Sequence, residues 1–282
     1  MAIFFHENGI QQKSRRTDEA FTTNGLGKPM IWKMIGQSVI GTSHIQSGKT
    51  CEDAVYHKIM YSDKHDEVLL CFVSDGAGSA KYAAKAADAS VLKGAEFVEK
   101  VIYSEDQLTE SNLIAVAEQI YDHLTTLAAE QQVPKNEFSC TLLGCIIFPD
   151  RAGFIQIGDG AIVRSVAGQH LTTVWWPHNG EYQNTTTFLI DDPNFPHLKT
   201  KVIDETITEI GIFTDGLQML TLNNETEGVH QPFFNNLFPL LRRATEPDHL
   251  AILNNRLIEY LSGDVINNRT DDDKTLFLAT RL

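Results

Sequence analysis

Four aspartate clusters stand where apolar, strand-like runs of this sequence begin or end. Asp75, Asp159 and Asp215 each follow such a run and are each followed by glycine. The order reverses at 271–273, where three aspartates precede the C-terminal run TLFLATRL. One Asp-Gly pair after a strand is usually a turn. Four acidic strand ends in one chain predict instead that the carboxylates serve a common purpose.

The adjacent pair Glu52 and Asp53 opens another strand-like run. If these strands share one sheet edge, five or more carboxylates converge, and no matching set of lysines or arginines stands beside them in the sequence. Buried, uncompensated charge is very costly. Hard divalent cations such as Mg²⁺ and Mn²⁺ prefer oxygen ligands and are the natural partners. No G-x-S-x-G elbow or P-loop competes with a metal site.

The apolar pattern places these carboxylates on a series of strands and helices. Strands are expected at 30–44, 51–62, 68–75, 139–148, 152–166, 207–215 and 275–282. Helices are expected at 80–102, 106–132, 231–245 and 247–263. Short polar loops between the first strands favour antiparallel pairing. The order strands, helices, strands, helices, strand therefore predicts an α+β fold.

Two segments lack clear periodicity. Residues 1–29 are rich in turn-forming residues and are interpreted as an N-terminal arm, which leaves 30–282 as the principal domain. Residues 168–205 are polar, aromatic and irregular. A segment of this length and character is commonly a functional loop, so we expect a flap-like excursion there.

Composition limits the class of protein. The 282 residues carry a formal net charge of −14, which disfavours nucleic-acid binding because that function needs a basic surface. No run is long and apolar enough for a membrane span, and no signal peptide is evident. The four cysteines form no C-x-x-C pair and are expected to be reduced. We therefore expect a cytoplasmic protein, and a monomer, with no membrane partner.

The acidic motifs resemble those of the type 2C metal-dependent protein phosphatases, the PPM family. The chain carries CEDA, VSDGAGSA, FSCTLLG, IGDG, FTDGL and DDDKT in the order of the family's signature, from about Met30 to the C-terminus. The resemblance implies a four-layer α-β-β-α sandwich, in which two mainly antiparallel sheets are flanked by helix pairs. It also implies two or three Mn²⁺ or Mg²⁺ ions at one end.

Carried over to this chain, the resemblance assigns roles to individual residues. Asp75 would bridge two metals, and the carbonyl oxygen of Gly76 would bind one of them. Asp215 and Asp272 would complete the shell of the other metal. The choice of Asp272 follows from matching DDKT to the family's Asp-Asn-x-Thr. A metal-activated water would then attack phosphorus in line, without a covalent phosphoenzyme.

Further acidic residues have looser roles by the same resemblance. Glu52 and Asp53 would act mainly through metal-bound waters. Asp159 matches a family aspartate associated with a third, looser metal. Asp271 and Asp273, which flank the matched aspartate, are interpreted as solvated charge.

The sequence departs from the family at two positions. Many members have a histidine after the Asp-Gly and an arginine four residues before the Glu-Asp pair, where this chain has Ala77 and Gly48. The family histidine is proposed to protonate the leaving group, and the arginine grips the phosphate. His44 is the candidate for the missing acid, and Lys49 for the missing cation, although each is also compatible with a surface role.

The sequence thus predicts a phosphatase of phosphorylated proteins that acts on phosphoserine or phosphothreonine. One alternative is a phosphatase-like binding or regulatory module with little or no turnover, which the loss of the family histidine and arginine favours. Another is a metal-dependent phosphohydrolase of small molecules. Retention of the acidic set favours the protein phosphatase.

Overall fold

The structure, a computed structural model, describes residues 32–61, 67–103, 107–166, 169–177 and 186–281. The predicted N-terminal arm, 1–29, lies outside the described residues. None of the described helices is long and apolar enough to cross a membrane.

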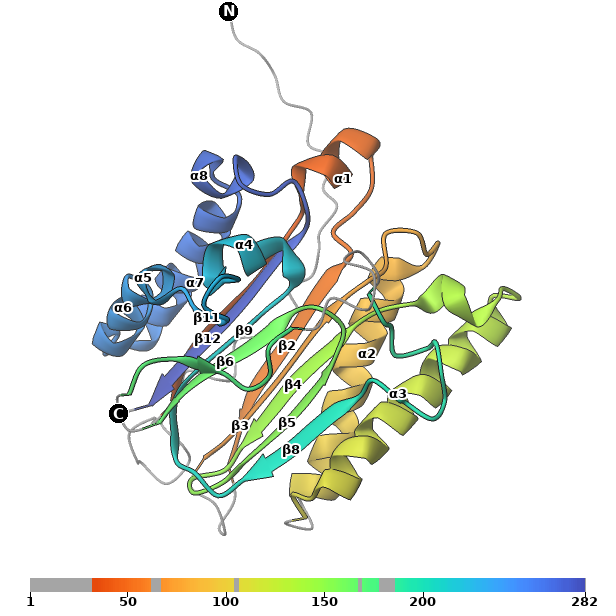
Figure 1. Cartoon of the computed structure of the whole chain (residues 1–282), viewed down its shortest axis with the longest axis horizontal. Coiled ribbons are helices and arrows are strands. Elements are labelled where there is room, and N and C mark those ends of the chain that lie inside the picture. The colour runs from red at the N-terminus through yellow and green to blue at the C-terminus, as the bar shows by residue number, and fades with distance from the viewer. Residues whose placement is uncertain (1–31, 62–66, 104–106, 167–168, 178–185, 282) are drawn as a thin grey trace, which may run out of the picture.

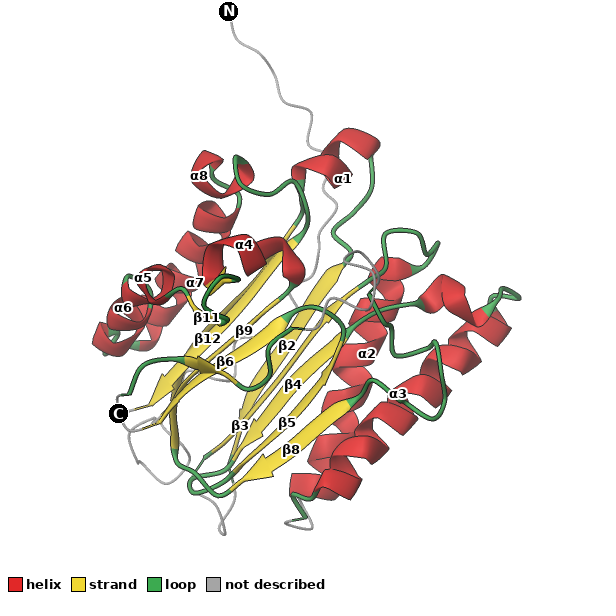
Figure 2. Ribbon diagram, in the orientation of Figure 1, coloured by secondary structure: helices red, strands yellow, loops and turns green. Residues whose placement is uncertain are grey.

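Two five-stranded sheets form the centre of the molecule, and every pairing within them is antiparallel (Figure 2). The first sheet has the order β1 (Trp32–Val39), β12 (Lys274–Arg281), β9 (Ile207–Phe213), β6 (Ala161–Val166) and β7 (Thr172–Thr173). The second has the order β2 (Asp53–Met60), β3 (Val68–Asp75), β4 (Leu142–Ile147), β5 (Ala152–Ile157) and β8 (Lys199–Ile203). A two-stranded ribbon consists of β10 (Leu222–Asn223) and β11 (Gly228–Val229).

Helices cover the outer face of each sheet (Figure 1). The second sheet is covered by α2 (Ala83–Phe97), its π-helical continuation Val98–Tyr103, and α3 (Glu110–Glu130). The first sheet is covered by α5 (Gln231–Asn235), α6 (Phe238–Arg243) and α7 (Pro247–Leu261). Shorter helices are α1 (Thr42–Ser47), α4 (Gln218–Thr221), α8 (Asp264–Asn267) and the 3₁₀ turns Lys135–Phe138 and Asp215–Leu217. The predicted four-layer α-β-β-α sandwich is confirmed.

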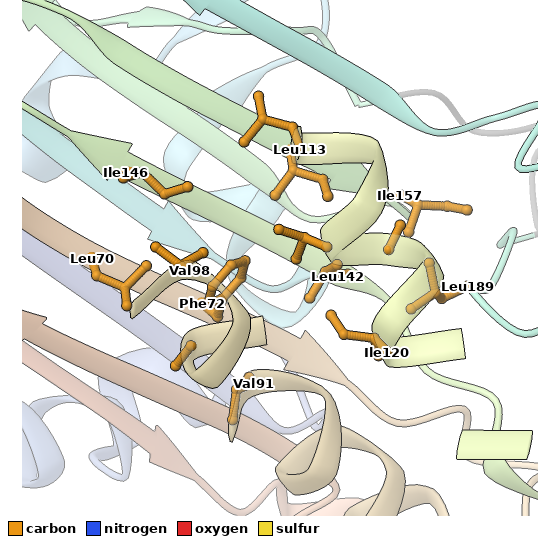
Figure 3. Packing of buried hydrophobic residues seen from close by; sticks show 14 of the residues in the cluster. Leu70, Phe72, Val91, Val98, Leu113, Ile120, Leu142, Ile146, Ile157 and Leu189 are labelled. Carbon is orange, nitrogen blue, oxygen red and sulfur yellow. The ribbon is translucent and has the colours of Figure 1, made fainter. Parts of the chain in front are cut away.

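The layers explain why the central strands are apolar at nearly every position. Each sheet is buried on both faces, so side chains that alternate along β3 enter two different cores. Leu70 and Phe72 pack beneath α2 and α3, whereas Leu69 and Cys71 pack between the sheets. Figure 3 shows Val91 and Ile120 of the two helices beside Phe72 and Leu142 of the sheet.

Several predicted boundaries are wrong, for local reasons. The strand predicted at 30–44 ends at Val39 and is followed by α1, so His44 lies on a short helix rather than at the end of a strand. The run 152–166 is two strands in different sheets. The chain turns between them at Gly158, whose φ of 108° is a left-handed conformation that favours glycine. The helix predicted at 231–245 is broken into α5 and α6.

The segment 168–205 is less irregular than predicted. It contains β7 and β8, and β8 is the edge strand of the second sheet, paired with β5. Its sequence KTKVI lacks the continuous apolar pattern of the central strands because no residue of it is fully buried. The neighbouring residues 178–185 lie outside the described residues.

Candidate metal centre

The predicted acidic residues meet at one end of the sandwich. Asp75 is the last residue of β3, Asp159 lies in the turn between β5 and β6, and Asp215 follows β9. One carboxylate oxygen from each lies within 4.8 Å of those of the other two. Residues from both sheets, more than 50 positions apart in the sequence, therefore share one small volume.

A cavity of about 170 Å³ opens at this cluster. Asp272 joins the three aspartates in its lining, together with Gly76, Ala77, Gly78 and His44. The excursion also contributes to it through Thr186 and Phe188. Glu52 and Asp53 are not among the residues that line the cavity.

Close backbone approach holds the cluster together. A Cβ added at Gly216 would lie 2.0 Å from the carbonyl oxygen of Asp273, so no larger residue fits there without movement. The N–H of Gly76 donates to the carbonyl of Glu52 at 3.0 Å. These contacts tie the end of β3 to the start of β2, and the turn after β9 to the start of β12.

The carboxylates repel one another in a poorly solvated place. Burial raises the pKa of Asp75, and the neighbouring aspartates Asp53, Asp215 and Asp272 raise it further. Burial, then Asp159 and Asp272, raise the pKa of Asp215 to about 7. Burial also raises the pKa of Asp272. A bound cation would relieve this repulsion between the carboxylates, because it favours their charged forms.

Asp53 lies beneath the cluster and is only 8% exposed. Its Oδ2 accepts hydrogen bonds from the hydroxyls of Thr214 and Thr275, both at 2.8 Å. Burial nevertheless raises its pKa to about 8, against the opposing effect of these two bonds and with a further rise from Asp273 and Asp215. Its Oδ1 has no hydrogen-bond partner among the residues that the structure describes.

The donor set fits hard divalent cations. The buried Oδ1 atoms of Asp53 and Asp215 both lack hydrogen-bond partners. Within the described ranges, no lysine or arginine forms an ion pair with Asp75, Asp159 or Asp215. Clustered carboxylate oxygens without cationic side chains are the donors that Mg²⁺ and Mn²⁺ prefer.

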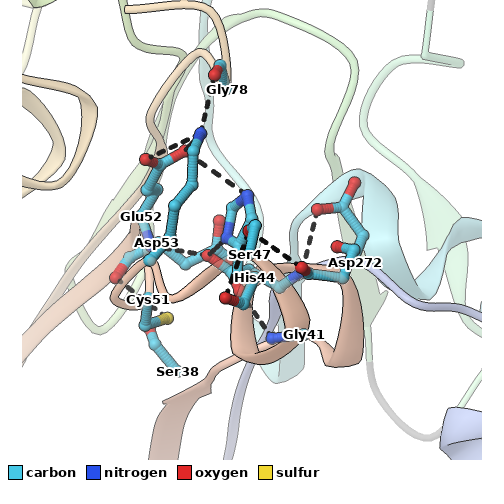
Figure 4. Close-up of polar contacts among 12 residues, drawn as sticks. Ser38, Gly41, His44, Ser47, Cys51, Glu52, Asp53, Gly78 and Asp272 are labelled. Atoms are coloured by element: carbon cyan, nitrogen blue, oxygen red, sulfur yellow. Dashed lines mark hydrogen bonds and ion pairs between the residues drawn. The ribbon is translucent and has the colours of Figure 1, made fainter. Parts of the chain in front are cut away.

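Glu52 lies beside the cluster in a different environment. Its Oε1 is 3.2 Å from the Lys49 ammonium, and its Oε2 is 3.5 Å from His44 Nε2. Lys49 also donates to the carbonyl of Gly78 at 2.7 Å. Figure 4 shows His44, Glu52 and Gly78 around this group of contacts. Both residues predicted to act in catalysis, His44 and Lys49, therefore contact one carboxylate beside the cavity.

Asp273 is not the solvated charge that was predicted. Its side chain is buried, its Oδ1 accepts the N–H of Gly41 at 2.6 Å, and its Oδ2 accepts the N–H of Glu52 at 2.5 Å. The same Oδ2 is 3.0 Å from His44 Nδ1. Asp273 thus fixes α1 and the start of β2 against β12. Only its position just before a buried strand signalled this role in the sequence.

Two more residues of the site were missed. Thr186 donates its hydroxyl to Asp159 Oδ2 at 2.5 Å. Phe188 packs on the small apolar cluster of Ala77, Ala80 and Ala83. Both lie in the excursion, where the irregular pattern carries no signal for particular contacts.

Gly48 stands at the position where many family members have an arginine. It ends α1 with a φ of 71°, and an added Cβ would have no neighbour within 4 Å.

The family profile described as Protein phosphatase 2C matches residues 40–262. The chain belongs to the protein phosphatase 2C family. It is 32% identical over 255 residues to Serine/threonine-protein phosphatase 3 of Escherichia coli (strain K12), which covers 89% of this chain and 98% of that protein. Members of the protein phosphatase 2C family are metal-dependent hydrolases, so the predicted resemblance is confirmed.

Solved structures with 15–16% sequence identity share the fold. The Mycobacterium tuberculosis serine/threonine phosphatase PstP/Ppp has a TM-score of 0.59 and covers 89% of this chain and 99% of its own. A bacterial serine phosphatase has a TM-score of 0.57, with 88% and 97% covered. RsbX in complex with magnesium has a TM-score of 0.51, with 90% and 98% covered.

Proposed function

We propose that this protein is a metal-dependent phosphatase that hydrolyses phosphoserine and phosphothreonine in proteins. The observation that carries the proposal is the cavity lined by Asp75, Asp159, Asp215 and Asp272, with which no lysine or arginine of the described residues forms an ion pair. The 32% identity to a serine/threonine-protein phosphatase over nearly its full length supports the substrate class.

Two Mn²⁺ or Mg²⁺ ions would be held by the carboxylates of Asp75, Asp215 and Asp272 and by the carbonyl of Gly76. Asp159 would hold a third. When bound, such cations supply the positive charge that acidifies water and offsets charge on phosphoryl oxygens. The magnesium in the related RsbX structure supports this class of ion.

The residues around the cluster orient it. Thr214 and Thr275 hold one oxygen of Asp53, so its free Oδ1 has a fixed direction. Thr186 does the same for Asp159. Phe188 closes one wall of the cavity with apolar surface and excludes water from that side.

His44 is the proposed proton donor to the leaving serine oxygen. It lines the cavity, and its Nδ1 lies 3.0 Å from Asp273 Oδ2, which leaves Nε2 on the side of Glu52. A histidine oriented by a buried carboxylate is a common arrangement for a general acid. Lys49 is the proposed cation that attracts the phosphate, and it acts by charge because its ammonium is already bound to Glu52 and Gly78.

We further propose that the protein acts as a monomer in the cytoplasm, in signalling through phosphorylated proteins. The net charge of −14 supports a partner other than nucleic acid. The domain boundary at residue 30 and the flap role of 168–205 are part of the same proposal. The contact of Thr186 and Phe188 with the cavity supports the flap role.

The decisive experiment measures phosphate release from phosphoserine and phosphothreonine peptides and from a small aryl phosphate. Each is tested with Mn²⁺, Mg²⁺ or a chelator. Asp215→Asn is the matched control, since it keeps the size and removes the charge, and its turnover should fall by orders of magnitude. Metal-dependent hydrolysis of both substrate types supports the proposal.

Other outcomes select the alternatives. Hydrolysis of the aryl phosphate without any peptide activity would indicate a small-molecule phosphohydrolase. Tight peptide binding without turnover would indicate a binding module, which the absence of a histidine at Ala77 favours. Full activity after exhaustive chelation would exclude the metal mechanism.

A further inference from the structure

A second cavity, of about 430 Å³, opens beside the metal cavity. Gly78 lines both of them, so the two cavities adjoin at this residue. The other walls of the second cavity include Lys49, Ser79, Lys81 and Glu137. This inference rests on the proposed function. If the phosphate of a peptide occupies the metal cavity, the residues that flank it on one side lie in the second.

Most charges in the second cavity are already balanced. The ammonium of Lys49 is bound to Glu52. The carboxylate of Glu137 accepts the backbone N–H of Lys81 at 2.7 Å, next to the N-terminus of α2, where the helix dipole favours negative charge. The ammonium of Lys81 differs, since within the described residues it contacts no carboxylate and lies 5.3 Å from the ring centre of Tyr82.

A second lysine, Lys85 in α2, lies near Lys81 and adds to its positive charge. Tyr82 stacks on Phe138 with ring centres 4.9 Å apart, and the ammonium of Lys85 lies 5.7 Å from the ring centre of Phe138. Two stacked rings therefore lie between two lysine ammonium groups, and we call this set of Lys81, Tyr82, Phe138 and Lys85 the cationic strip. Like that of Lys81, the ammonium of Lys85 has no carboxylate partner in the described part of the chain.

Helix stability does not explain the cationic strip. Lysines at the N-terminal end of a helix oppose its dipole and weaken it. The chain as a whole carries a net charge of −14, and the adjoining metal cavity is acidic. An unpaired positive strip beside an acidic cavity attracts anionic groups to the entrance and orients them there.

We propose that the cationic strip and the second cavity bind acidic side chains that flank the phosphorylated residue, so that the preferred substrate is an acidic phosphopeptide. The group on the peptide that pairs with Lys81 would be an anion, either a carboxylate or a second phosphate. The ring of Tyr82 lies beside the Lys81 ammonium and supplies apolar contact for the peptide backbone, whereas Phe138 is buried and supports the ring of Tyr82.

The test compares kcat/KM for phosphoserine peptides that differ at one flanking position, which carries glutamate, phosphoserine, alanine or lysine. The wild-type enzyme should prefer the glutamate peptide to the alanine peptide by roughly 10-fold at low salt, mainly through KM, and lose the preference at high salt. The phosphoserine arm shows whether a second phosphate substitutes for the carboxylate.

Lys81→Glu should abolish or invert this preference. Lys201→Glu, on the exposed edge strand β8 and outside both cavities, makes the same change in net charge and should retain it. A preference that survives Lys81→Glu, or one that Lys201→Glu removes equally, would overturn the proposal.

A binding measurement tests the cationic strip independently of the proposed phosphatase activity. Fluorescence anisotropy with the same peptides and chelated protein measures the affinity of the cationic strip for each peptide in the absence of turnover. Acidic peptides should bind more tightly than alanine peptides, and Lys81→Glu should erase the difference. Equal binding of all four peptides by the wild type would contradict the cationic strip even if hydrolysis occurs.

Discussion

Asp53 of β2 is the direct antiparallel partner of Asp75 of β3. Like charges opposite each other across two strands destabilise a sheet, and here the pair is also poorly solvated, which raises the pKa of both carboxyl groups. Asp215, which follows β9 of the other sheet, lies close enough to both residues to raise the pKa of each further. Repulsion between these carboxylates destabilises this end of the molecule. Bound cations would offset the repulsion and so explain the arrangement.

Metal binding should therefore stabilise the fold. A ligand that binds only the folded state at 100 times its dissociation constant adds about 2.7 kcal/mol to the free energy of unfolding. Titration of chelated protein with Mn²⁺ or Mg²⁺ should raise the melting temperature in a saturable way. Asp75→Asn should remove most of this increase, and no increase in the wild type would exclude the proposed site.

The free energy of unfolding of the metal-free protein should depend on pH because of the carboxyl groups with raised pKa. The unfolded chain releases the Asp215 proton near pH 4, whereas the folded protein holds it until about pH 7. Between these values the folded state binds more protons, so the contribution of Asp215 to stability falls as pH rises. The amide of the Asp215→Asn variant cannot ionise, and comparison of this variant with the wild type cancels the other titrating groups.

In chelator, the difference in unfolding free energy between Asp215→Asn and wild type should thus grow in favour of the variant from pH 5 to pH 8, by a few kcal/mol. Denaturant titrations at several pH values measure it. Saturating Mn²⁺ should reverse the order, because only the wild type keeps the full ligand set. A difference independent of pH would refute the assignment of the strain to Asp215.

Loss of His44 should affect substrates unequally. An aryl phosphate has a good leaving group, whereas a serine alkoxide needs a proton in the transition state. His44→Ala should slow phosphoserine peptides by roughly 10²-fold and the aryl phosphate much less. Asp273→Asn should cause part of the same selective loss, because the amide nitrogen cannot accept from His44 Nδ1. Equal losses on both substrates would indicate a role in phosphate positioning.

Restoring the family histidine should need a second change. Ala77 is buried against Phe188, so Ala77→His alone should displace that ring and lower activity. The double variant Ala77→His with Phe188→Ala should narrow the gap between phosphoserine and aryl phosphate rates relative to Phe188→Ala alone. An unchanged gap would show that the cavity does not place residue 77 near the leaving group.

Gly216→Ala should disturb the metal centre through the backbone. Its Cβ would lie 2.0 Å from the Asp273 carbonyl, and overpacking of this kind costs about 1–3 kcal/mol. A lower melting temperature and weaker metal binding are expected. Gly78→Ala is the control for stability, because its Cβ would come no closer than 3.9 Å to Glu52. Equal effects of the two variants would mean that the Gly216 contact is not the cause.

The sequence by itself determined the layers and most of the acidic residues. Strands buried on both faces must be apolar along their length, so β3 and β4 are evident in the pattern, and a carboxylate just after such a strand is conspicuous. Asp75, Asp159, Asp215 and Asp272 were selected on this basis and by resemblance, and the structure brings all four to one cavity.

Only the tertiary structure decided how neighbouring residues of similar type divide their roles. Asp272 and Asp273 are adjacent and chemically identical, yet one lines the cavity and the other is buried against Gly41 and His44. Thr186 and Phe188 reach the cavity from an irregular segment. Local periodicity indicates which face of an element is buried. Desolvation and hydrogen bonding, however, depend on groups that are distant in the chain. These contacts form only after the two sheets have packed.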